Sequence, residues 1–258
     1  MSDKLIVEKQ GHIAVITMNN PPANTWTEAS LKELTSIVKE LNADMQIFSL
    51  VLKSSSEKFF SAGADLNLFA DSDRSVARDM ARYFGEAFET LSQFRGVSIA
   101  AMNGWAMGGG LEVALACDIR IAEEQVQMAL PEAKVGLLPC AGGTQNLTML
   151  VGEGWTKKMI LCGERVKAAK ALEIGLVEEV VATGESVNRA MEMAEQVAEQ
   201  SPMAVAACKQ LIQSNRTRAW DQGYILEREL FVDLFHSEDQ KEGVNAFLGK
   251  RKAEWKNR

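Results

Sequence analysis

The sequence predicts an α/β fold in which parallel strands are joined by helical crossovers. Short apolar segments, such as 47–52 and 97–102, are typical of buried strands. They alternate with longer segments, such as 27–42 and 75–93, whose apolar residues recur every three or four positions, as on one face of a helix. This alternation favours parallel strands with right-handed connections.

The chain opens with two strands, 5–8 and 12–18, on either side of a turn at Gln10-Gly11. Pro21 and Pro22 end the second strand because proline cannot donate to the ladder. Thr27 is the expected N-cap of the first helix, since its hydroxyl can accept from the first free N–H groups.

After the strand at 47–52 we expect a polar loop, 54–65, the helix 75–93 and the strand 97–102. Residues 111–117 are apolar on every side, which predicts a central, fully buried helix. Two short strands, 119–122 and 126–128, follow it.

Beyond about Gly152 the sequence is almost entirely helical in pattern. We expect one strand at 176–181 and helices at 155–161, 168–174, 187–199, 203–214, 219–235 and 240–248. We therefore predict a core that spans 1–200 and a C-terminal helical region, 201–258, that serves packing or oligomerisation.

Composition excludes several classes of function. A net charge of −7 and a pI near 5.1 argue against a nucleic-acid-binding surface. The four cysteines lack the CxxC spacing of metal sites and are scattered as in a reducing compartment. No apolar run is long enough to span a membrane, and the N-terminus shows no signal pattern, so we expect a cytoplasmic protein.

The triplet Gly108-Gly109-Gly110 lies between an expected strand and the central helix. Glycine allows a ligand close to the backbone, and a helix N-terminus offers free N–H groups that can hold an oxyanion. The alternative is close packing of strand on helix, for which one glycine would usually suffice. The spacing matches neither the dinucleotide fingerprint nor the P-loop.

Two glutamates are candidates for acid–base chemistry. Glu112 follows the triplet among apolar neighbours, which predicts burial and a raised carboxyl pKa; its alternative role is to favour the helix dipole. From its local sequence, Glu132 after Pro131 is an exposed first-turn acid. Two carboxylates that face one water could accept and donate a proton, but their spacing along the chain does not show that they meet.

Several blocks of the chain, in the right order, resemble the crotonase superfamily, the enoyl-CoA hydratase/isomerase family. They are Ser61-Ala62-Gly63-Ala64-Asp65, the stretch from Ala101 to Glu112 with Cys117-Asp118, the stretch from Leu130 to Pro139 with Ala141 to Gln145, and the ending from Phe247 to Lys252. The resemblance implies a crotonase-like spiral of ββα units with a helical C-terminal oligomerisation region. It also implies a homotrimer or a hexamer built as a dimer of trimers.

The resemblance further implies an acyl-CoA thioester substrate and no separate cofactor, because coenzyme A is part of the substrate. Backbone N–H groups of Ala64 and Gly109 would form the oxyanion hole. Glu112 would help activate water, and Glu132 would exchange the proton at the α-carbon. The expected substrate and CoA contacts are Ala62, Asp65, Leu66, Gly108 and Cys140. The basic residues Lys250, Arg251 and Lys252 are candidates for the CoA phosphates, from the same or a neighbouring subunit; the alternative is a solvated terminal helix.

Cys140 departs from the family pattern, which usually has glycine there, and we expect it to be a packed thiol. The presence of both glutamates favours hydration of a trans-2-enoyl-CoA. An isomerase on the same scaffold is the nearest alternative, since it could work with Glu132 alone. A non-catalytic CoA-binding or RNA-binding relative is disfavoured by the acidic pI and by both acids, and a serine hydrolase by the lack of GxSxG.

Overall fold

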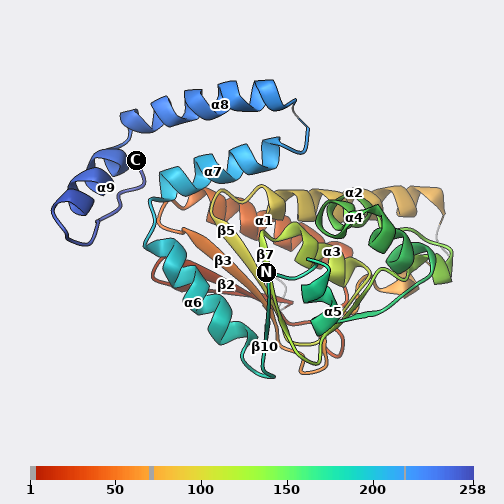
Figure 1. The fold of residues 1–258 in the computed structure, drawn as a ribbon. Coiled ribbons are helices and arrows are strands. Elements are labelled where there is room, and N and C mark those ends of the chain that lie inside the picture. Colours follow the sequence, from red (N-terminus) through yellow and green to blue (C-terminus); the bar gives the residue numbers. More distant parts are fainter. Residues whose placement is uncertain (1–3, 70–72, 218) are drawn as a thin grey trace.

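The computed structural model describes residues 4–69, 73–217 and 219–258. Within these residues the main sheet has six strands in the order β1-β2-β3-β5-β7-β10 (Figure 1). They are Leu5–Gln10, Ile13–Met18, Ser49–Ser54, Val97–Met102, Ile119–Glu123 and Glu179–Val181. Every neighbouring pair is parallel except β1 with β2, which confirms the predicted parallel α/β architecture.

A second, smaller sheet positions the site. Its strands, in the order β4-β6-β8-β9, are Phe59–Ser61, Trp105–Met107, Gln127–Ala129 and Val166–Lys167. The first three are parallel to one another, and β9 is antiparallel to β8. One strand of the main sheet, one of the small sheet and one helix follow each other repeatedly along the chain, as in β3-β4-α2 and β5-β6-α3. This repeat is the expected spiral of ββα units.

The helices enclose the sheets on both sides. Their bounds are Glu28–Ala43 (α1), Arg74–Ser92 (α2), Gly109–Ala116 (α3), Gly143–Leu161 (α4), Ala168–Glu173 (α5), Ser186–Ala198 (α6), Pro202–Ser214 (α7), Trp220–Asp233 (α8) and Glu238–Leu248 (α9). Helix α6 covers one face of the main sheet, whereas α8 and α9 lie beyond α7, apart from the sheet (Figure 1). No helix in the described part of the chain is long and apolar enough to cross a membrane.

Burial follows the predicted periodicities. On α1 the recurring Leu31, Leu34 and Val38 are completely buried. Thr27 caps this helix, because its hydroxyl accepts from the Ser30 N–H while Ser30 accepts from the Thr27 N–H. All residues of α3 are buried, so the prediction of a central helix is confirmed.

The short elements were predicted least well. The loop expected at 54–65 contains β4, and β6 and β9 were also missed. These strands have two or three residues each, so their pairing depends on distant neighbours rather than on a local pattern. Helix α4 consists of two helical segments that meet at Gly152, whose backbone leaves the helical region (φ 76°, ψ 168°). The second segment contains the helix expected at 155–161, and the first was not predicted.

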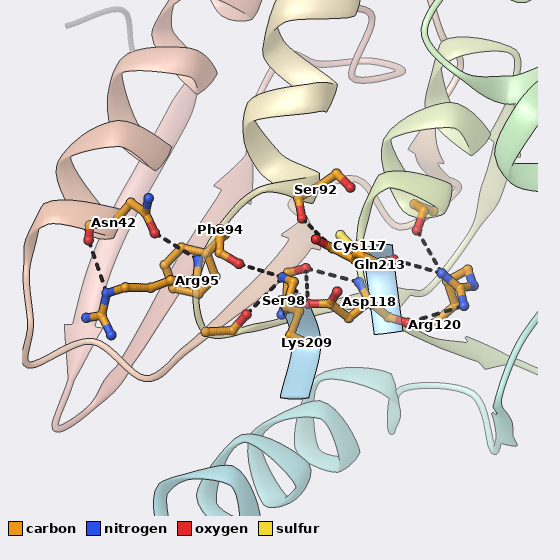
Figure 2. Close-up of polar contacts among 12 residues, drawn as sticks. Asn42, Ser92, Phe94, Arg95, Ser98, Cys117, Asp118, Arg120, Lys209 and Gln213 are labelled. Carbon is orange, nitrogen blue, oxygen red and sulfur yellow. Dashed lines mark hydrogen bonds and ion pairs between the residues drawn. The ribbon is translucent and has the colours of Figure 1, made fainter. Parts of the chain in front are cut away.

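A polar cluster joins α7 to the edge of the core (Figure 2). The Lys209 ammonium donates to the backbone oxygens of Phe94 and Gly96 and, at 2.7 Å, to the Asp118 carboxylate. Asp118 also accepts from the N–H and the hydroxyl of Ser98. The side chains of Lys209 and Asp118 are only 10% and 22% exposed. The charge of each is therefore matched by the other, and helix α7 is fixed to the start of β5.

We predict that Lys209→Met lowers the free energy of unfolding by about 3 kcal/mol, because it leaves the carboxylate of Asp118 without its cation in a largely buried place. Urea titration measures the loss. The control is Lys157→Met, which removes an ion pair with Glu153 whose side chains are 61% and 74% exposed, and should cost less than about 1 kcal/mol. Equal losses in the two variants would contradict the assigned role of the cluster.

Candidate active site

A cavity of about 540 Å³ opens where the carboxyl ends of β4, β6 and β8 meet. The residues expected as catalytic groups, oxyanion hole and substrate contacts all line it. They are Ala62, Ala64, Asp65, Leu66, Gly108, Gly109, Glu112, Glu132 and Cys140. The structure thus brings together segments that lie as much as 78 positions apart, from Ala62 to Cys140.

The backbone of residues 61–64 packs directly on the first turn of α3. Gly63 has φ +90°, and a Cβ atom there would lie 2.6 Å from the Met107 oxygen and 3.0 Å from the Gly109 nitrogen. A side chain would separate the two segments, so this glycine permits their close approach.

Two backbone N–H groups are available at this contact. Ala64 forms an isolated bridge with Trp26, in which the Trp26 N–H donates to the Gly63 oxygen and the Asp65 N–H to the Trp26 oxygen, so the Ala64 N–H is not used. Gly109 is the first residue of α3, where N–H groups have no partner within the helix. Neither N–H donates to an acceptor within residues 4–69, 73–217 and 219–258. The pair can therefore hold a developing oxyanion.

Glu112 is buried at the base of the cavity, with 2% of its surface exposed. Its Oε1 accepts from the Ala141 N–H at 2.8 Å and from the Gly143 N–H at 2.9 Å. Burial raises the pKa of this carboxyl, and the two hydrogen bonds oppose the rise because they favour the ionised form. Glu112 is therefore held in one orientation, and the two N–H donors offset part of the cost of burying its charge.

Glu132 has a different environment. It begins a short 3₁₀ helix, Glu132–Val135, and its Oε1 lies against Gly108, where a Cβ would come within 3.0 Å. Its Oε2 is buried and has no hydrogen-bond partner among the described residues. Burial and then the charge of Glu112 raise its pKa from 4.5 to about 7. The prediction from local sequence that Glu132 is an exposed surface acid is thus wrong.

Cys140 is exposed, not packed as predicted, and its side chain lines the cavity. The reason is that the segment runs along the cavity, since Leu137 and Leu138 line the same wall. Desolvation, followed by the charges of Glu112 and Glu132, raises the pKa of the thiol to about 11. At neutral pH the group is therefore a thiol and not a nucleophilic thiolate.

Other wall residues were not predicted. Of the predicted residues, Asp65 caps the 3₁₀ turn Leu66–Leu68 by accepting from the Asn67 N–H, and this turn places Leu66 on the cavity wall. The unpredicted residues include Thr25, Phe84, Met107, Lys134, Val135, Leu137, Leu138 and Arg165. Met107, Lys134, Val135, Leu137 and Leu138 lie inside the blocks that resemble the family, and Phe84 lies on the buried apolar face of α2.

The three basic residues near the C-terminus, Lys250, Arg251 and Lys252, do not line the described cavity wall. Arg251 forms a two-pronged ion pair with Glu242 of α9. Within the described ranges, no group of three or more His, Cys, Asp or Glu residues gathers as metal ligands.

Comparison with known proteins gives consistent matches along the chain. The model of the enoyl-CoA hydratase/isomerase family matches residues 8–258. A short-chain-enoyl-CoA hydratase from Clostridium acetobutylicum is 38% identical, with 99% of each chain covered. The solved structure of DspI from Pseudomonas aeruginosa is 62% identical, with a TM-score of 0.97 over 99% of this chain and 97% of that one. An enoyl-CoA hydratase structure from Bacillus anthracis is 34% identical, with a TM-score of 0.95 over 99% and 100%.

We predict that Glu132→Gln accelerates alkylation of Cys140 by iodoacetamide several-fold at about pH 8.5, because it removes one of the negative charges that keep the thiol protonated. Mass spectrometry of the Cys140 peptide over time measures the rate. Cys162, which is exposed and lies outside the cavity wall, is the control within the same sample. An unchanged Cys140 rate would show that Glu132 does not act on the thiol.

Proposed function

The chain belongs to the enoyl-CoA hydratase/isomerase family, and we propose that it adds water across the 2,3 double bond of a trans-2-enoyl-CoA to give a 3-hydroxyacyl-CoA. The observation that carries this proposal is the convergence of Glu112 and Glu132 on one cavity beside two free N–H groups. No separate cofactor is invoked, because the thioester itself accepts the electrons of the reaction.

In the proposed mechanism the thioester oxygen lies between the N–H groups of Ala64 and Gly109. As water attacks C3, electrons move through the double bond onto this oxygen and form an enolate. Preorganised donors stabilise that charge more than the neutral ground state, which lowers the barrier. The N-terminus of α3 adds the positive end of its dipole.

The two carboxyls divide the proton transfers. Glu112, whose ionised form is stabilised by two N–H donors, takes the proton of the attacking water. Glu132, with its pKa near 7, is protonated in part of the molecules at neutral pH and gives its proton to C2. The hydroxyl is then on C3 and the new hydrogen on C2, and exchange with water returns the proton from Glu112 to Glu132.

The presence of Glu112 also distinguishes a hydratase from a double-bond isomerase. An isomerase needs one carboxyl to move a proton between carbons, whereas hydration needs a second one to activate water. The buried Glu112, held by Ala141 and Gly143, favours the hydratase. The net charge of −7 disfavours an RNA-binding role.

We further propose a homotrimer or a hexamer in the cytoplasm. The support for assembly is the exposed apolar surface of the C-terminal helices, which a neighbouring subunit would cover. It includes Phe231, Phe235, Phe247 and Leu248, which are 53% to 84% exposed.

The test is the loss of enoyl-thioester absorbance when the protein is mixed with crotonyl-CoA. We expect turnover by the wild type, and a fall in kcat of about 10² to 10⁴-fold in Glu132→Gln, because the proton donor to C2 is lost. Titration calorimetry with butyryl-CoA, which cannot be hydrated, should give nearly the same Kd for both proteins.

Glu112→Ala should likewise lose hydration, and Glu153→Gln, which changes an exposed carboxylate on α4, should lose nothing. Full hydration by Glu112→Ala, or loss of butyryl-CoA binding together with activity in Glu132→Gln, would overturn the assigned roles.

We predict that kcat/KM for crotonyl-CoA falls as pH rises through about 7, because Glu132 then loses the proton that it must donate to C2. Hydration neither consumes nor releases a proton, so the equilibrium constant requires the same inflection for 3-hydroxybutyryl-CoA in the reverse direction. Initial rates from about pH 5 to pH 9 measure it. A profile that is flat across neutral pH would contradict the raised pKa.

A further inference from the structure

Three buried aromatic side chains connect the two halves of the proposed oxyanion hole. We call Trp26, Phe88 and Phe84 the aromatic triad; they are 2%, 1% and 2% exposed. The rings of Trp26 and Phe88 meet edge to face with 5.6 Å between their centroids, and those of Phe88 and Phe84 with 5.7 Å. Aromatic pairs prefer this arrangement, so the three rings hold one another in place.

One end of the aromatic triad holds the segment that carries the Ala64 N–H. The Trp26 N–H donates to the Gly63 oxygen at 2.8 Å, and the Trp26 oxygen accepts from the Asp65 N–H at 3.2 Å. The backbone of Trp26 is thus bonded on either side of Ala64, whose own N–H has no acceptor in the described part of the chain. A shift of Trp26 would therefore move this donor.

The other end of the aromatic triad lies against Gly109, which carries the second N–H. A Cβ on Gly109 would come within 3.0 Å of the Phe84 ring, so this ring packs directly on that backbone. Phe84 and Phe88 are four residues apart on α2, which places them on the same buried face of the helix. Helix α2 therefore supports both donors although it contributes neither.

Only this second end of the aromatic triad reaches the cavity. Phe84 lines the described cavity wall, whereas Phe88 and Trp26 do not. The indole nitrogen of Trp26 is buried without a hydrogen-bond partner in the described ranges, so its ring acts by packing and not by a bond that it donates. Because protein interiors are close-packed, a gap at Phe88 would let the rings on both sides shift.

From these contacts we infer that the aromatic triad sets the separation of the Ala64 and Gly109 N–H groups, with Trp26 and Phe88 as positioning residues of the oxyanion hole. The inference rests on the proposed function, in which both N–H groups hold the enolate oxygen. Loss of one such donor lowers kcat by about 10² to 10³-fold. A donor that is displaced but still present should cost a part of this.

The experiment measures kcat for crotonyl-CoA, the Kd of butyryl-CoA and, by difference infrared spectroscopy, the carbonyl stretch of bound butyryl-CoA with an isotope-labelled thioester carbonyl. Hydrogen bonds to the carbonyl lower the frequency of this stretch. Phe88→Leu and Trp26→Leu should lower kcat by about tenfold or more and return the stretch towards that of the free ligand. The Kd should change by less than about threefold, because the neutral carbonyl gains less from the donors than the enolate does.

Trp26→Phe tests the role of the ring at the first end of the triad. It keeps an aromatic ring beside Phe88 and should lose less kcat, and less of the frequency shift, than Trp26→Leu. Where Phe88→Leu fails to fold, the difference between these two Trp26 variants decides the same question. Equal values in Trp26→Phe and Trp26→Leu would contradict the inference.

Phe94→Leu is the matched control. Phe94 is completely buried just after α2, but it neither belongs to the aromatic triad nor lines the described cavity wall. It should lose stability in urea, as Phe88→Leu does, and keep the kcat and the carbonyl stretch of the wild type.

A carbonyl stretch in Phe88→Leu and Trp26→Leu equal to that of the wild type would overturn the inference, as would an equal loss of kcat in Phe94→Leu. The failure of the proposed function looks different, because it concerns the wild type. A wild type that does not hydrate crotonyl-CoA, or that binds butyryl-CoA without any change in the carbonyl stretch, would overturn the assigned oxyanion hole and the inference with it.

Discussion

The site depends on the close approach of two backbones, the segment 61–64 and the first turn of α3. A Cβ on Gly63 would lie 2.6 Å from the Met107 oxygen and 3.0 Å from the Gly109 nitrogen, so a side chain there would push the two backbones apart. A Cβ on Gly109 would lie 3.0 Å from the ring of Phe84, which is a tight contact. The approach of the two backbones places the N–H groups of Ala64 and Gly109 beside the same cavity. Without it, the chain would have one free helix terminus but no pair of donors for a single oxygen.

The same approach explains where Glu112 lies. Because α3 is buried on all sides, its first-turn acid enters the protein interior, where an ionised carboxylate is costly. The N–H groups of Ala141 and Gly143 offset that cost, and Gly143 leaves room for the acid, since a Cβ there would come within 2.8 Å of its Oε1. These hydrogen bonds join the start of α4 to the start of α3. They also hold the neighbouring Cys140 at the cavity wall.

Local sequence predicted the parts of the fold that depend on local physics. The cap at Thr27, the apolar stripe of α1 and the all-apolar helix α3 follow from periodicity and side-chain chemistry. Strands β6 and β9 could not be predicted in this way because they form only when distant segments meet. The site residues came from the resemblance of whole blocks, whereas the exposure of Cys140 and the role of Leu138 in the wall depend on how the segment 132–142 bends.

The difference between the environments of the two glutamates is the feature of the site that local sequence predicts least. They share a residue type and a cavity, yet Glu112 accepts two N–H bonds that favour its charge, and Glu132 has a buried oxygen with no partner in the part of the chain that the structure describes. Each negative charge also raises the cost of the other, so the pair tends to keep one proton between them, on Glu132. An acid beside a base is what addition of water to a double bond requires. That asymmetry comes from the backbone of residues 141–143, which binds one carboxylate and not the other.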